Sequence, residues 1–83
     1  MIMPTIHRNG TSASVLLEQA REACDAARGL LKALIKADPN GRDYYLRDVA
    51  FEVARREHEA RFRAVGDVLR DMEALAEHCH GAL

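Results

Sequence analysis

The sequence predicts an all-α protein: a long antiparallel two-helix hairpin with a short N-terminal arm, completed by homo-oligomerisation into a four-helix bundle or a larger ring. Three observations lead to this prediction. Apolar residues recur at three- and four-residue spacing in two long segments, 12–37 and 46–80. A segment rich in turn-forming residues, 38–45, separates them. Alanine supplies much of the apolar content, so two helices alone have little area to bury and a second chain is expected to complete the core.

The first eleven residues are predicted to form an extended arm. Ile2, Met3 and Ile6 are apolar, whereas Pro4 disfavours a helix and Asn9-Gly10 is a turn signal. Thr11 or Ser12 then provides a side-chain oxygen that can cap the helix that follows.

Segment 12–37 is predicted to be the first helix. Its main apolar stripe consists of Leu16, Ala20, Ala23, Ala27, Leu30 and Leu34. Acidic residues stand near its start, and Lys32 and Lys36 near its end, as the helix dipole prefers. Gly29 costs up to about 1 kcal/mol relative to alanine inside a helix, and close contact with another helix is one reason to tolerate it.

Segment 38–45 is predicted to reverse the chain. Pro39 fixes its own φ and lacks an amide hydrogen, and Asn40 and Gly41 tolerate positive φ. Four polar or aromatic residues follow directly: Arg42, Asp43, Tyr44 and Tyr45. A chain reversal alone does not require a cation, an anion and two phenol side chains.

Segment 46–80 is predicted to be the second helix. Its packed seam consists of Phe51, Ala54, His58, Phe62, Val65, Leu69, Met72, Ala76 and Cys79. A flanking stripe is expected to broaden the buried face, with members Leu46, Ala50, Val53, Ala60, Ala64, Val68 and Leu75. His58 is expected to be a buried neutral imidazole, hydrogen-bonded across the bundle; the alternative is a pH-sensitive interface.

Pairing the two helices directly back from the turn places Leu31 near Glu52. On this register the second helix extends past the start of the first, and its last apolar residues, Met72 to Cys79, need another cover. The arm is expected to cover some of them through Ile2, Met3 and Ile6, and another protomer the rest.

Composition bounds the class of protein. With 83 residues the chain is expected to form one domain, 1–83. Its 12 basic and 13 acidic residues nearly cancel, so no attraction to a nucleic-acid polymer or an anionic membrane is expected.

No apolar run approaches the ~20 residues of a membrane helix, and residues 1–10 lack the apolar core of a secretory leader. Cys24 and Cys79 are too few for a disulfide framework, so reduced thiols and a cytoplasmic location are predicted.

No catalytic constellation stands out, so the chain is predicted not to be an enzyme and to carry no cofactor. Its serines have no histidine placed beside them, and it has no phosphate-binding glycine loop of the Walker type. No metal site is expected either, because adjacent residues such as His78 and Cys79 point about 100° apart on a helix. A weaker alternative is the Glu77-x-x-His80 pair of carboxylate-bridged di-iron bundles, with Glu18 or Glu22 as further ligands.

Two segments are candidate ligand-binding sites. Arg8, Asn9 and Thr11 place a cation and polar groups at a helix N-terminus, which suits an anion. Arg42, Tyr44 and Tyr45 place a guanidinium beside two aromatic rings. The two segments lie at opposite ends of one hairpin, but an antiparallel dimer would bring them together in a pocket for a small anionic, nucleotide-like ligand.

Two other roles for the turn stay open. It can dock on a partner protein through its tyrosines. Alternatively it only packs: Tyr44 and Tyr45 then cover the bundle end, Asp43 caps the second helix and Arg42 pairs with Asp38.

The segments Asn9-Gly10-Thr11, Pro39 to Tyr45 and Glu73 to His78 resemble a family of small uncharacterised proteins from tailed phages and prophages. The resemblance covers most of the chain and supplies no catalytic residues. It implies a phage-type binding protein in the host cytoplasm. Such a protein would sequester a nucleotide signal of host defence, or would inhibit a host protein or assist assembly.

Overall fold

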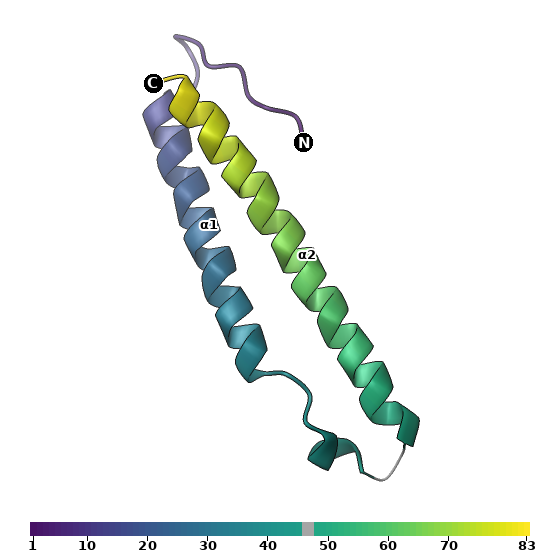
Figure 1. Cartoon of the computed structure of the whole chain (residues 1–83). Helices are drawn as coiled ribbons and strands as arrows, with labels where there is room; N and C mark the ends of the chain where they lie inside the picture. The colour runs from purple at the N-terminus through teal and green to yellow at the C-terminus, as the bar shows by residue number, and fades with distance from the viewer. Residues whose placement is uncertain (46–47) are drawn as a thin grey trace.

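The computed structural model describes residues 1–45 and 48–83. Two helices, α1 (Ala13–Lys36) and α2 (Asp48–Gly81), lie side by side and antiparallel, and a short 3-10 helix, η1 (Gly41–Tyr44), stands between them (Figure 1). The described residues include no strand. The predicted all-α hairpin is therefore confirmed. The molecule is long and thin, measuring 61 × 20 × 17 Å.

The first helix begins where a side chain satisfies its free amides. Ser12, rather than Thr11, is the cap residue, and its hydroxyl oxygen accepts a hydrogen bond from the Val15 amide at 3.3 Å. At the other end the Ala37 amide donates to the Ala33 carbonyl at 3.1 Å, which closes the last turn.

The core between the helices is built largely from small side chains. The buried apolar residues are Ala13, Leu17, Ala20, Cys24 and Ala27 of α1, with Ala54 and Cys79 of α2. Small side chains let the two helix backbones approach closely, but each buries little area. His58 is the one polar residue buried among the described residues, at 4% exposure.

The expected register is wrong. His58 contacts the backbone of Leu34, so Leu31 does not lie beside Glu52. The reason is that residues 37–45 do not turn back at once: they run beyond the end of α1 and form η1 before α2 begins (Figure 1). Consequently the end of α2 reaches the start of α1, and Cys79 is fully buried. The part of α2 that extends past α1 is instead its first turns.

The N-terminal arm lies against the end of α2. His78 donates a hydrogen bond from Nε2 to the Pro4 carbonyl at 2.8 Å. Met3 and Ile6 are half-buried, as a covering role for the arm requires. Ile2, in contrast, is 94% exposed, so its expected role in that cover is wrong.

The two flanks of the hairpin differ in chemistry. One carries an ion pair across the helices, Arg28 to Glu73 at 3.4 Å. The other carries the flanking stripe of α2, which was expected to be buried. Val53 and Val68 of that stripe are 51% and 55% exposed, so α1 alone does not cover it. Leu46 lies outside the described residues.

Candidate functional site

The turn between the helices is held by its own polar groups. The Asn40 side chain accepts a hydrogen bond from the Arg42 amide at 3.0 Å, and the Asn40 carbonyl accepts one from Asp43 at 3.0 Å. Asn40 and Gly41 tolerate positive φ but do not adopt it: no described residue has positive φ, and Asn40 is extended. Asp43 lies within η1, and α2 begins only at Asp48, so the alternative in which Asp43 caps α2 is wrong.

The two adjacent tyrosines of the turn have different environments. Tyr44 is half-buried, and its ring centroid lies 6.1 Å from that of Phe51, at an interplanar angle of 33°. Arg55 covers the same phenylalanine, with its guanidinium carbon 6.0 Å from the ring centroid. Tyr45 is 78% exposed. Tyr44 therefore anchors the turn to α2, and Tyr45 is left free of the core.

Arg42 is exposed beside this anchor. Its side chain is exposed to solvent, and its Nε donates a hydrogen bond to the Asn40 side-chain oxygen at 3.5 Å. Asp38, the expected ion-pair partner of Arg42, has its carboxylate 4.0 Å from Nε2 of His58 instead. The turn thus exposes the guanidinium of Arg42 and the phenol ring of Tyr45 to solvent.

The second predicted segment lies at the far end of the molecule. Arg8, Asn9 and Thr11 are all exposed, and the Gly10 amide donates to the His7 carbonyl at 3.2 Å in a tight turn. The start of α1 and the turn are at opposite ends of the hairpin (Figure 1). A single chain does not bring these residues near Arg42 and Tyr45, so the composite pocket stays a prediction that needs a second chain.

His58 acts as a clamp between the helices. Its Nε2 donates to the Leu34 carbonyl at 2.7 Å, while Nδ1 can accept from Arg61 at 3.3 Å. Its ring meets Phe62 edge-on, with centroids 5.5 Å apart and an interplanar angle of 72°. The predicted hydrogen bond across the hairpin is confirmed. The Leu34 carbonyl belongs to the last turn of α1, where helix carbonyls lack partners within the helix.

Metal-binding geometry does not assemble within the described part of one chain. No group of three or more His, Cys, Asp or Glu side chains lies close enough to hold an ion there. Glu77 and His80 are exposed, while Cys24 and Cys79 are buried free thiols. Nor is any described helix long and apolar enough to cross a bilayer.

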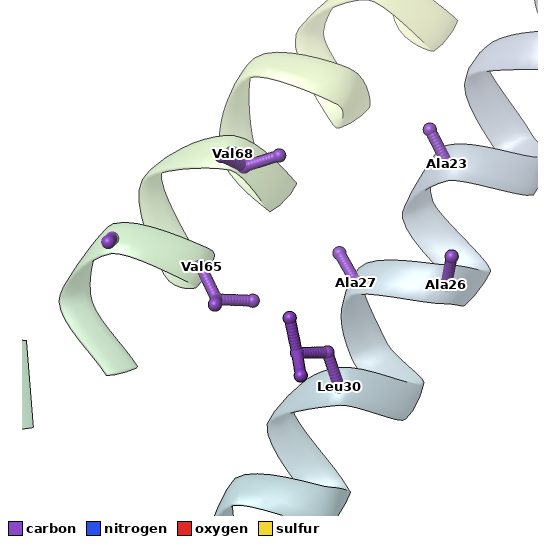
Figure 2. A pocket seen from close by; sticks show the side chains of 7 residues that line it. Ala23, Ala26, Ala27, Leu30, Val65 and Val68 are labelled. Atoms are coloured by element: carbon purple, nitrogen blue, oxygen red, sulfur yellow. The ribbon is translucent and has the colours of Figure 1, made fainter. Parts of the chain in front are cut away.

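The structure adds an apolar groove that the sequence did not predict as a site (Figure 2). Its volume is about 410 Å³, and it opens along the apolar flank between the two helices. The lining is entirely aliphatic: Ala23, Ala26, Ala27, Leu30, Ala64, Val65 and Val68. Such a lining offers an anion no donor but can receive other apolar side chains. The exposed stripe of α2 was the sequence signal for one wall of this groove.

Comparison with known proteins identifies no relative: no family model, curated protein or solved structure matches the chain. Two features of the molecule bear on its function: the anchored turn and the apolar groove.

Proposed function

We propose that this chain is a non-enzymatic, homo-oligomeric binding protein that docks on a partner protein through Arg42 and Tyr45 of the turn. One observation carries the proposal: Tyr45 is 78% exposed on a segment that is otherwise anchored. The anchor consists of the Asn40 hydrogen bonds and the packing of Tyr44 on Phe51. Among the residues that the structure describes, no aromatic partner packs on this ring, and the Arg42 guanidinium lies in the same turn.

The chemistry of this pair suits a protein partner. Tyrosine and arginine are the residue types that most often dominate binding energy at protein interfaces. A segment that is already ordered loses less conformational entropy on binding than a flexible loop does. The resemblance to small phage proteins makes a host cytoplasmic protein the first partner to test.

The double variant Arg42→Ala/Tyr45→Ala tests this function. We expect it to bind the partner at least about 30-fold more weakly, because loss of a dominant contact costs about 2 kcal/mol. The immobilised chain would capture the partner from bacterial lysate, and titration calorimetry with the purified partner would give the affinity. Circular dichroism should show unchanged helix content, since both side chains are exposed.

Arg56→Ala is the matched control, because Arg56 is 74% exposed on α2 and lies outside the turn. If the double variant and the control bind the captured protein equally well, the turn is not the docking element.

A small anionic or nucleotide-like ligand is a second candidate. It is favoured by the exposed Arg8, Asn9 and Thr11, which a second chain can bring to the turn. Cyclic and linear nucleotides should then raise Tm in a concentration-dependent way, by the equivalent of about 2.7 kcal/mol at 100 times Kd. Arg8→Ala should abolish the shift. If no nucleotide shifts Tm, this candidate fails and the protein-docking function stands unaffected.

A further inference from the structure

The apolar face is the exposed side of the groove: Ala23, Ala26 and Leu30 of α1 with Ala64, Val65 and Val68 of α2. It lies near the middle of both helices, and Figure 2 shows the side chains of its two walls on neighbouring turns of α1 and α2. Leu30 and Val68 are 48% and 55% exposed there, with no polar side chain in the groove to justify their position. An exposed apolar patch of this kind marks an interaction site, so we expect another molecule to bind the apolar face.

The whole chain exposes more surface than a compact monomer of its mass, as a chain that folds with a second copy would. The accessible surface is 6369 Å². A compact monomer of 9.3 kDa would expose about 5,000 Å², so each chain carries an excess of about 1,400 Å². A standard interface needs only about 800 Å² per partner. The radius of gyration is likewise 18.2 Å, against about 12 Å for a compact chain of this length.

The charges identify the occupant as a second copy and set its direction. Because Ala27 and Val65 lie at one level of the hairpin, residues 1–26 and 65–83 form one half and residues 27–64 the other. The first half contains three basic and seven acidic residues, and the second contains nine basic and six acidic. The hairpin therefore has one negative end and one positive end. Two copies attract only if they pair with their ends exchanged.

The sizes of the central side chains agree with that direction. With a two-fold axis through the groove, each α1 packs antiparallel on the other α1, and Leu30 reaches the level of the partner's Ala23. On α2, Val68 reaches the level of the partner's Ala64. A large side chain thus meets a small one in both helix pairs, which is how helix surfaces interdigitate.

We infer that a second copy packs on the apolar face with its ends exchanged, forming an antiparallel four-helix dimer. This inference rests on the self-association included in the proposed function and specifies its surface and direction. It also places Arg42 and Tyr45 of one chain at the same end as the partner's Arg8, because each hairpin end then meets the opposite end of the other.

The surface is tested by Leu30→Glu. This change should raise the dimer dissociation constant at least about a hundredfold, because it puts a carboxylate at the dry centre of the interface. Sedimentation equilibrium would measure it, with circular dichroism confirming that helix content is retained. Ile35→Glu is the matched control: Ile35 is 64% exposed, but it lies beside His58 and Phe62, outside the groove. A monomeric wild-type chain, or a dimer weakened equally by both changes, would overturn the inference.

The direction is tested with a spin label on Asp43→Cys, an exposed site in η1. With the ends exchanged, the two labels lie at opposite ends of a particle at least as long as one hairpin, whose long axis is 61 Å. Double electron–electron resonance should then show only a long distance. A short distance would overturn the exchanged pairing. Unsubstituted protein is the labelling control, because Cys24 and Cys79 are buried. Neither measurement involves the docking residues, so failure here is separable from failure of the turn to bind a partner.

Discussion

His58→Ala should lower the free energy of unfolding by about 2–4 kcal/mol. The substitution removes the donor to the part-buried Leu34 carbonyl, and with it the hydrogen bond between the two helices. It also removes a ring that packs edge-on against Phe62, so a cavity adds to the cost. Thermal unfolding followed by circular dichroism would measure the change, at about 4–8 °C of Tm per kcal/mol for a domain of this size.

His80→Ala is the matched control, because His80 is an exposed histidine on the same helix. We expect it to change stability by less than about 0.5 kcal/mol. His58→Gln should recover part of the loss, since its amide can donate a hydrogen bond to the same carbonyl. All variants must be compared at one protein concentration, because self-association couples stability to concentration. Equal effects of His58→Ala and His80→Ala would show that His58 is not a clamp.

The hairpin could be predicted from the sequence because apolar spacing reports directly which residues face a neighbouring helix. The same spacing puts His58 on the seam, where a buried imidazole needs a hydrogen bond, and the structure provides that bond. The register could not be predicted in this way. It depends on the path of residues 37–45, whose extended course and 3-10 turn leave no periodic pattern in the sequence.

The candidate site can be predicted only in part from the sequence, for a similar reason. Tyr44 and Tyr45 are chemically identical neighbours, and only the geometry of η1 decides that one contacts Phe51 while the other faces solvent. The flanking stripe of α2 is apolar in the sequence and is expected to be buried, yet Val53 and Val68 of that stripe are more than half exposed. A pattern in one chain shows that a face is apolar; it does not show which helix covers it.

Ala20→Leu should lower the free energy of unfolding by about 1–3 kcal/mol. Ala20 is 2% exposed in a core where small side chains let the helices lie close together. A leucine has no space there unless the helices separate or nearby side chains leave their preferred rotamers. Urea unfolding followed by circular dichroism would measure the change in midpoint and slope.

Ala74→Leu is the control for that prediction, because Ala74 is exposed on α2. Alanine and leucine are both strong helix formers, so the exchange alters intrinsic helix stability little at either site. The difference between the two variants therefore measures how closely the helices pack at Ala20. If Ala20→Leu stabilises the protein as much as Ala74→Leu or more, the interface has room for larger side chains. The small residues of the core would then not be required for close helix approach.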